Sequence, residues 1–443
     1  MGAMPIEKLL VNMSLPIMIS MLVEALYNVV DSIFVAQISE NALTAVTLVF
    51  PVQNLIIAIA VGTGVGINAF LSRSLGEKNF ERANRVANNG IFLGLISYFI
   101  FLIFGLLFSK SYFTSQIDDI EIIEYGVSYL SIICMGSICR FVHIVFERLL
   151  MSAGKTFYTM IAQAVGAITN IILDPILIFG YFGLPAMGTA GAAIATVIGQ
   201  IIAATLVIIF NFKVNKEVNI SAKGFSPDLG VIKDIYSVGI PSITMMSIIS
   251  VTAYGMNNIL NNFSYTAIAV FGIYFKLQSF IFMPVFGLNN GMVPIIAYNY
   301  GAKNKERIIK TIKLSITYAC CIMIFGLILI QILPEKILEL FNASEDMLDI
   351  GVPALRIISL SYIFAGISVV ASAVYQAFGN ALLSLLTAVS RQLVVLLPAA
   401  YILSLFRNVN LIWLSFPIAE IISLVLSIIF LKYIYDKRIA PMK

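Results

Sequence analysis

The stretch L-G-E-K-N-F-E-R at residues 75–82 returns as Y-G-A-K-N-K-E-R at residues 300–307, an offset of 225 residues. The same offset, without a gap, pairs further identical residues, among them Pro16 with Pro241 and Gly154 with Gly379. One register held over so long a span predicts a tandem duplication. Each copy should span about half of the chain, so its composition decides what the protein is.

The composition of this 443-residue chain is that of a membrane protein. Hydrophobic residues make up 60% and charged residues 11%, whereas a soluble domain has roughly 45–50% apolar and 25% charged residues. About 20 apolar residues are enough for a helix to cross the bilayer core. The sequence therefore predicts an all-α integral membrane protein with twelve spans, six in each repeat. These are expected near residues 15–38, 46–72, 87–109, 125–147, 157–180, 187–211, 231–257, 266–297, 312–333, 351–377, 381–405 and 411–433.

An even number of spans in each copy makes the two repeats parallel. Both copies enter the membrane from the same side, so a pseudo-twofold axis along the membrane normal relates them and a pathway is expected between them. The polar segment around 213–233 is typical of a linker. We predict an N-lobe at 1–215, a cytoplasmic linker at 216–230 and a C-lobe at 231–443.

Loop charges predict the orientation of the chain. Alternate loops, including the segments 73–85, 148–155 and 303–313, hold nearly all the lysines and arginines, while the other loops are mainly acidic. The positive-inside rule then places both termini in the cytoplasm, in a multi-pass protein of the plasma membrane. The net charge of +4 is interpreted as a topology signal, so we expect a lipid bilayer around the chain and no nucleic-acid partner.

Polar residues on one face of the first span are the first candidates for function. Glu24, Asn28 and Asp31 are spaced i, i+4 and i+7, which places them on one side of a helix. A carboxylate near the bilayer centre costs at least about 2.5–3.5 kcal/mol, so it normally faces a cavity, a partner or an ion pathway. We interpret Asp31 as functional, whereas a functional and a structural role stay equally open for Glu24.

A second polar group is expected at a similar depth in the span at 157–180. Asn170 and Asp174 lie one turn apart and precede Pro175, whose ring leaves the carbonyl of Ile171 without a donor. We predict that Asp174 and Asp31 share a cavity towards the outer side of the N-lobe. Such oxygens suit a small cation, and two neighbouring carboxylates favour uptake of a proton. The structural alternative is that nearby hydroxyls, amides or backbone groups satisfy each carboxylate.

The second repeat lacks this acidic pair. At the offset of 225, Asp31 corresponds to Met256 and Asp174 to Ala399. We therefore predict ion chemistry in the N-lobe, with the C-lobe forming part of the cleft wall. The charges expected inside the C-lobe are Lys276, Arg356, Arg391 and Glu420.

Flexible and polarisable methionines suit a site that accepts many apolar shapes, although core or lipid packing explains them equally well. The span at 266–297 contains two prolines, Pro284 and Pro294, and is predicted to bend or move. The residues that we predict to line a substrate cleft are Glu24, Asn28, Met21, Met245, Met256, Gln53, Gln278 and Met283.

The sequence lacks motifs for enzymatic chemistry. A single histidine, His143, cannot form a metal site with scattered neighbours, so we expect it to be a hydrogen-bonded core residue. The chain has no Walker A loop, G-x-S-x-G or H-E-x-x-H pattern. We therefore expect no enzyme activity and no cofactor, and energy must come from an ion gradient unless the protein is a facilitator.

Four stretches carry a resemblance to a known family. They are S-L-P-I-M-I-S at 14–20, L-G-E-K-N at 75–79, N-I-I-L-D-P-I-L-I-F-G at 170–180 and G-A-A-I-A-T at 191–196. The chain resembles the multidrug and toxic compound extrusion (MATE) family, most closely its MepA-like bacterial branch. The resemblance implies two six-helix bundles that form a V around a cleft. It also implies a functional monomer that exports amphipathic organic cations in exchange for H⁺ or Na⁺ by alternating access.

The family's cation site is carried over to Asp31, Asn170, Asp174 and Thr196, where all four residue types are present. The resemblance thus implies binding of H⁺ or Na⁺ by these residues. An acidic pair that another branch carries in its C-lobe is absent. Two alternatives stay open: a flippase of lipid-linked or amphipathic substrates, for which a more cationic cleft is expected, and an intramembrane enzyme in which Asp31 and Asp174 imitate an aspartyl dyad.

Overall fold

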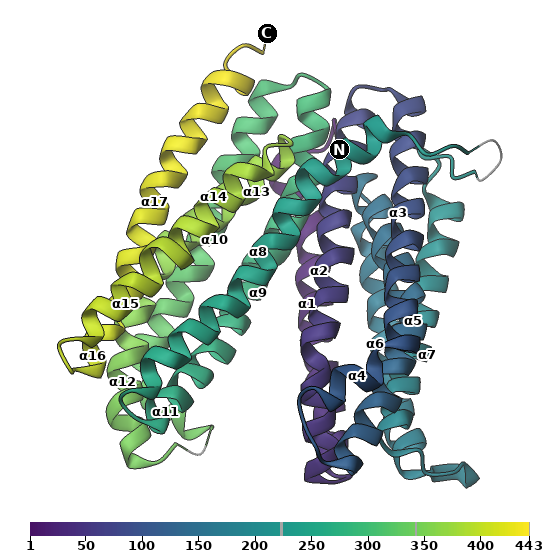
Figure 1. Ribbon diagram of the computed structural model, residues 1–443. Coiled ribbons are helices and arrows are strands. Elements are labelled where there is room, and N and C mark those ends of the chain that lie inside the picture. The colour runs from purple at the N-terminus through teal and green to yellow at the C-terminus, as the bar shows by residue number, and fades with distance from the viewer. Residues whose placement is uncertain (222–224, 342, 443) are drawn as a thin grey trace. The chain divides into compact units, whose positions relative to one another are not determined.

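The regular secondary structure of the described residues is helical. The computed structural model describes residues 1–221, 225–341 and 343–442, and Figure 1 shows how its long helices run. Within these ranges helices, turns and loops are assigned and no residue is assigned to a strand. Eleven described helices are long and apolar enough to cross a membrane, and the number reaches twelve if one bent pair counts as a single span. The prediction of an all-α membrane protein is therefore confirmed.

Each repeat contributes its own set of helices, joined by short connections. The first repeat contains α1 (Ile6–Ala36), α2 (Glu40–Gly76), α3 (Phe80–Leu107), α4 (Ser109–Thr114), α5 (Ile120–Ser152), α6 (Thr156–Phe179), the 3₁₀ turn η1 (Tyr181–Gly183) and α7 (Gly188–Val214). The second contains α8 (Leu229–Asn261), α9 (Tyr265–Gly301), α10 (Lys305–Ile332), α11 (Pro334–Glu339), α12 (Glu345–Ser359), α13 (Tyr362–Ala377), α14 (Ala381–Val389), the π-helix η2 (Ser390–Leu396), α15 (Leu397–Ser404), α16 (Val409–Ile412), α17 (Ser415–Ile434) and the π-helix η3 (Tyr435–Ile439).

The duplication is visible in the caps of the helices. Ser39 begins α2 by accepting a hydrogen bond from a backbone amide three residues ahead, and its repeat partner Ser264 begins α9 in the same way. Asn79 and Asn304 likewise cap α3 and α10. Because a capping side chain satisfies one of the four free amides at a helix start, the repeated residues fix the same helix boundaries twice.

Backbone conformation repeats as well. Lys78 and Lys303, which precede the capping asparagines, have φ of 55° and 56°, and Gly154 and Gly379 both have φ of 78°. Left-handed φ is uncommon for a residue with a side chain, so its occurrence at equivalent lysines indicates that both turns keep the geometry of a common ancestor.

The span predicted as continuous at 351–377 is broken. Its two parts, α12 and α13, meet at an angle of 51°. At the break the hydroxyls of Ser359 and Ser361 each donate to a backbone carbonyl three residues back. Such side-chain bonds compete with the regular helical ladder, and neither a proline nor a glycine lies at the break, residues 359–362.

The helices pack into two compact units, each described here by itself. One unit consists of Leu15–Gly239, and the other of Met1–Ser14 together with Ile240–Lys443. Packing thus divides the chain at different residues from the predicted lobes, because the first turns of α1 belong to the second unit and the first turns of α8 to the first. The two division points, after Ser14 and after Gly239, are themselves 225 residues apart.

The segment before α8 is held against α3 by asparagine side chains. Asn84 and Asn89 of α3 accept hydrogen bonds from the backbone amides of Asn219 and Asp228, at 2.7 and 2.9 Å. Arg82 forms an ion pair of 2.9 Å with Asp234 in the first turns of α8. These bonds explain why the start of α8 packs with the first unit.

Gly66 and Gly291, which are also 225 residues apart, allow the first turns of α8 and α1 to approach α2 and α9 closely. A Cβ atom at Gly66 of α2 would collide with the carbonyl oxygen of Ile235 in α8, and one at Gly291 of α9 would collide with Ser14 of α1. In both places a side chain would require a backbone to move.

Gly66→Ala is therefore expected to destabilise the protein by about 1–3 kcal/mol, the usual cost of overpacking a helix contact. The measurement is thermal unfolding of the purified protein in detergent. Gly272→Ala in α9 is the matched control, because no atom lies within 4 Å of a Cβ at that position and alanine favours helix. Equal unfolding temperatures of the two variants would contradict this account of Gly66.

Candidate functional site

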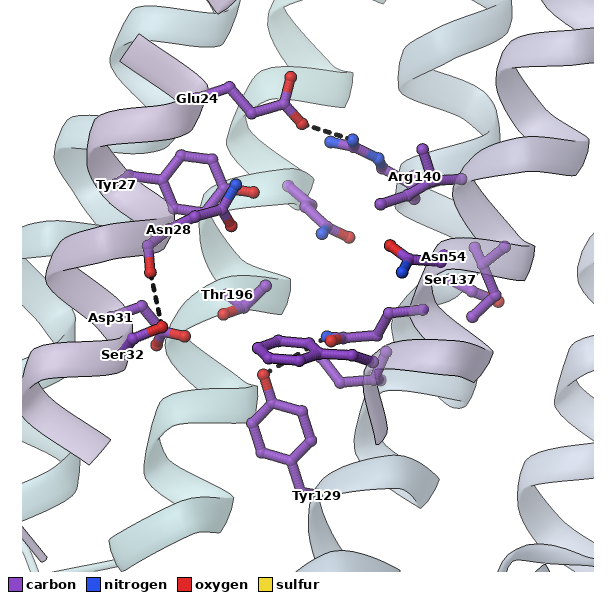
Figure 2. A pocket seen from close by; sticks show the side chains of 16 residues that line it. Glu24, Tyr27, Asn28, Asp31, Ser32, Asn54, Tyr129, Ser137, Arg140 and Thr196 are labelled. Atoms are coloured by element: carbon purple, nitrogen blue, oxygen red, sulfur yellow. Dashed lines mark hydrogen bonds and ion pairs between the residues drawn. The ribbon is translucent and has the colours of Figure 1, made fainter. Parts of the chain in front are cut away.

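A polar cavity opens inside the unit that contains residues 15–239. Its volume is about 200 Å³, and it lies among α1, α2, α5 and α7 (Figure 2). Its lining residues are Glu24, Tyr27, Asn28, Asp31, Ser32, Phe50, Gln53, Asn54, Ile56, Ile57, Tyr129, Ile133, Ser137, Arg140, Thr196 and Gln200. We call it the N-lobe cavity. Five polar residues come from α1, as the single face formed by Glu24, Asn28 and Asp31 predicts.

Two of the predicted cation-binding residues, Asp31 and Thr196, line this cavity, while Asn170 and Asp174 lie outside its lining. Asn170 donates one hydrogen bond to Asp174 at 3.1 Å and another to the Thr196 hydroxyl at 3.4 Å. Asp31 and Thr196 both line the cavity, and Asp31 is close enough to Asp174 for their charges to interact. The spacing of Asn170 and Asp174 by one turn of α6 presents both side chains to α7.

The oxygens of this group are not fully satisfied. Asn170 and Asp174 have exposed fractions of 2% and 0%. Among the described residues, one buried oxygen of each, together with Oδ1 of Asp31, has no hydrogen-bond partner. A buried acceptor without a partner costs free energy, and a proton or a small cation would supply the missing partner. Whether these side chains have a functional or a structural role stays a prediction.

An ion pair also faces the cavity. Nη2 of Arg140 in α5 lies 2.6 Å from Oε1 of Glu24 in α1, and Figure 2 shows the two side chains reaching towards each other. The partner of Glu24 is thus an arginine from another helix, which spacing within a single span cannot indicate. The sequence did contain an indication of such a pair, because an arginine inside a membrane span requires an acidic partner that is also inside the membrane.

The remaining predicted cleft residues divide into two groups. Asn28 and Gln53 line the N-lobe cavity, and Gln53 donates a hydrogen bond to the Tyr129 hydroxyl at 3.4 Å. Met21 is half-buried on α1 outside the cavity lining. The other group belongs to the second unit, where Met256 is fully buried and the half-buried side chains are Met245, Gln278 and Met283. A role of these residues in a cleft stays a prediction.

One comparison decides the family. The MatE family profile matches residues 16–176 and 241–402, one segment in each repeat. The chain belongs to the MATE family. Among its relatives is the multidrug export protein MepA of Staphylococcus haemolyticus (strain JCSC1435), which is 29% identical over 417 residues covering 94% of this chain and 91% of the relative. MepA of Staphylococcus aureus (strain MSSA476) is 28% identical over 418 residues with the same coverage.

Solved MATE structures have the same fold. An outward-facing multidrug resistance MATE transporter of the MOP superfamily is 26% identical, with a TM-score of 0.89 over 97% of this chain and 96% of that one. A MATE structure in the straight conformation is also 26% identical, with a TM-score of 0.91 and the same coverage. The protein is therefore a multi-pass membrane transporter of the MATE multidrug efflux type and not an enzyme, with small-molecule drugs as substrates.

The two repeats of this MATE transporter differ in their charges as the sequence indicates. In the second unit the position equivalent to Asp31 is the buried Met256. The buried acid of that unit, Glu420 in α17, lies 2.9 Å from Arg391 in the π-helix η2. Among the described residues the two buried acids without an ion-pair partner thus belong to the first repeat, whereas Glu420 has a cationic partner and leaves only its Oε2 atom without a hydrogen bond.

Proposed function

We propose that this protein exports amphipathic organic cations in exchange for H⁺ or Na⁺, with Asp31, Asn170, Asp174 and Thr196 as the site of the coupling ion. The observation that carries the proposal is the group of unpartnered oxygens on Asp31, Asn170 and Asp174, buried beside the N-lobe cavity. A proton or Na⁺ at this group would supply the partner that these oxygens lack.

The position of Asp31 on α1 supports a link between ion binding and movement. α1 packs less closely on its neighbours than α5 packs on α2 and α7, or α6 on α7. An ion shared between Asp31 and the pair on α6 would draw α1 towards α6 and α7, and its loss would release α1. The ion can bias this equilibrium only by its different affinity for the two states, typically a few kcal/mol.

The same group explains why an organic cation would compete with the ion. Asp31 lines the N-lobe cavity and interacts electrostatically with Asp174. Aromatic side chains of Tyr27, Phe50 and Tyr129 also line it, and such rings bind cations by their faces. A bound organic cation would therefore neutralise the same carboxylates as the coupling ion, so that each favours release of the other.

The test is ethidium uptake into proteoliposomes with a pH gradient or a Na⁺ gradient imposed separately. A lumen that is acidic, or rich in Na⁺, is expected to drive ethidium accumulation several-fold above the level without a gradient, because the ion leaves as ethidium enters. Liposomes without protein are the control. Equal ethidium uptake with and without each gradient would contradict antiport and would show that the protein acts as a facilitator.

A further inference from the structure

Lys276 of α9 is an embedded charge without a partner among the described residues. Apolar runs lie on both sides of it in the sequence, A-I-A-V-F-G-I-Y-F at 267–275 and F-I-F-M-P-V-F-G-L at 280–288. Its side chain is exposed, and its ammonium forms no hydrogen bond or ion pair with a described residue. Arg391 of the same unit differs in this respect, because it pairs with Glu420 at 2.9 Å. The proposed ion exchange gives Lys276 no role.

The packing of α9 turns Lys276 away from the core of its unit. α9 packs on α10, α12 and α13, and the rings of Phe271 and Tyr274 contact Phe416 of α17, with centroids 6.3 and 5.3 Å apart. Lys276 follows Tyr274 by two residues, which is roughly 200° around a helix, so it lies on the opposite side. On that side Gly272 is exposed, and no atom lies within 4 Å of a Cβ at its position. The side of α9 that carries Lys276 is therefore open.

Lys276 lies too deep in its span for the ammonium to reach the membrane surface. From Tyr265, the first residue of α9, the helix rises about 16 Å to Lys276 at 1.5 Å per residue. This is about half of the 30 Å hydrocarbon core. The four-carbon stem of a lysine covers only part of that distance. Because a charge against lipid at this depth is costly, Lys276 should face a water-filled space or a ligand.

The helix before α9 presents polar side chains at the same depth. Ser250 precedes the last residue of α8 by as many positions as Lys276 follows the first residue of α9. It belongs to a set of exposed polar residues on one side of α8, namely Thr244, Ser247, Ser250, Tyr254 and Asn258. The repeat partners of four of them are exposed and apolar, namely Ile19, Leu22, Val29 and Ile33 of α1. Since polar residues in a span normally face water or a partner, the second unit presents a hydrated surface where α1 is apolar.

Internal symmetry relates the surroundings of Lys276 to a cavity wall. The segment 50–57 of α2 contributes to the lining of the N-lobe cavity. Its repeat equivalent is 275–282 of α9, which keeps the phenylalanine and the glutamine as Phe275 and Gln278. Lys276 takes the position of Pro51. The second repeat thus adds a positive charge to a segment that, in the first repeat, borders a cavity.

The neighbours of Lys276 define the class of ligand. Phe275 and Phe280, with exposed fractions of 36% and 54%, lie on either side of it around the helix. The ammonium requires an anion, and the rings offer an apolar surface to the same molecule. A lipid phosphate lies at the membrane surface, about half a bilayer core away, and a small inorganic anion would leave the rings without a contact. An aromatic molecule that carries a carboxylate matches both features.

We propose that Lys276 is a specificity-determining residue that binds the carboxylate of zwitterionic amphipathic substrates, with Phe275 and Phe280 in contact with their apolar part. This inference rests on the proposed export of amphipathic organic cations and narrows their class. A cationic group keeps the molecule within that class, and a carboxylate elsewhere on it pairs with the ammonium. Such a charge-assisted hydrogen bond is stronger than one between neutral groups.

The experiment compares two dyes that differ only in the carboxylate. Rhodamine 110 is a zwitterion with a free carboxylate, and rhodamine 123 is its methyl ester and a cation. Fluorescence anisotropy measures their binding to the protein in phosphatidylcholine nanodiscs, without any ion gradient. Lys276→Gln is expected to weaken the binding of rhodamine 110 by about tenfold or more, because it removes the charge that pairs with the carboxylate. The binding of rhodamine 123 should change by less than about threefold.

Three further variants locate the effect. Lys276→Arg keeps the charge, so rhodamine 110 should bind within about threefold of normal. Phe280→Ala removes the aromatic contact and is expected to weaken both dyes to a similar extent. Lys336→Gln is the matched control, because it makes the same change of charge at an exposed position of α11 and should leave both dyes unaffected. Nanodiscs without protein correct for binding to lipid.

Several outcomes would overturn the assignment of Lys276. They are equal binding of rhodamine 110 by Lys276→Gln and the unmodified protein, and equal weakening of both dyes by Lys276→Gln. Displacement of rhodamine 110 by excess inorganic phosphate would assign the lysine to a small free anion instead. Loss of the dependence on Lys276 in phosphatidylglycerol nanodiscs would assign it to a lipid headgroup.

The proposed antiport is tested separately by gradient-driven ethidium uptake. Failure of both gradients to drive that uptake would refute antiport and leave the preference for a carboxylate intact. Driven ethidium uptake together with rhodamine 110 binding that ignores Lys276 would refute only the preference.

Discussion

Asp31→Asn is expected to abolish ethidium accumulation driven by an ion gradient, a loss of about tenfold or more in initial rate. The substitution keeps the size and shape of the side chain but removes the negative charge that a proton or Na⁺ must neutralise. Asp31 has an unpartnered buried oxygen and lines the N-lobe cavity, whereas Glu24, the other carboxylate in that lining, is paired with Arg140.

Asp174→Asn should give a similar loss for a related reason. Asp174 is fully buried and accepts its hydrogen bond from Asn170, and an asparagine at this position can still accept that bond. Folding should therefore survive, as measured by expression and gel filtration, while coupling is lost. Near-normal driven uptake in both variants would return the two carboxylates to a structural role.

The control for these variants is Asp118→Asn, the same change of charge in the exposed loop between α4 and α5. Its driven uptake should stay within twofold of the unmodified protein, because a solvated charge far from the cavity interacts weakly with it. A fall as large as that of Asp31→Asn would indicate a general effect of net charge on insertion or stability.

Much of the fold could be predicted because membrane insertion imposes few choices. Long apolar runs must form helices that satisfy their own backbone groups. The repeat at 75–82 and 300–307 aligns the two copies, so the helix boundaries expected in one copy also estimate those in the other. The break between α12 and α13 could not be predicted in this way. The hydroxyls of Ser359 and Ser361 donate to backbone carbonyls at the break, and composition and periodicity do not indicate such contacts.

The grouping of the proposed ion site was accessible from sequence for the same reason. Asp31 and Asp174 are expensive in a bilayer, and Asn170 stands one turn from Asp174, so cost and spacing both pointed to these residues. Thr196 came from the family resemblance alone. The ion pair of Arg140 with Glu24 could not be predicted, because it is a 2.6 Å contact between two helices that spacing within one span does not indicate.

The ion pair between Glu24 and Arg140 leads to the second large effect. Glu24→Gln would leave the Arg140 guanidinium without the carboxylate that now lies 2.6 Å away, although Arg140 is largely buried, with an exposed side-chain fraction of 12%. An uncompensated cation in the wall would repel an organic cation in the N-lobe cavity. We expect ethidium to bind roughly tenfold more weakly, which corresponds to about 1.4 kcal/mol, with a loss of thermal stability as well.

The double variant Glu24→Gln/Arg140→Gln separates the guanidinium from the loss of the acid. If the unpaired charge is the cause, removing it should restore ethidium affinity to within about threefold of normal, and the double-mutant cycle should give a clear interaction energy between the two positions.

Glu7→Gln is the matched control, since Glu7 pairs with Lys310 at the same 2.6 Å distance but both side chains are about half exposed. Because exposed pairs contribute little, its binding should be unchanged. Equally weak binding of ethidium by Glu24→Gln and by the double variant would show that ethidium requires the Glu24 carboxylate itself. The interpretation that the ion pair only keeps the cavity wall uncharged would then be wrong.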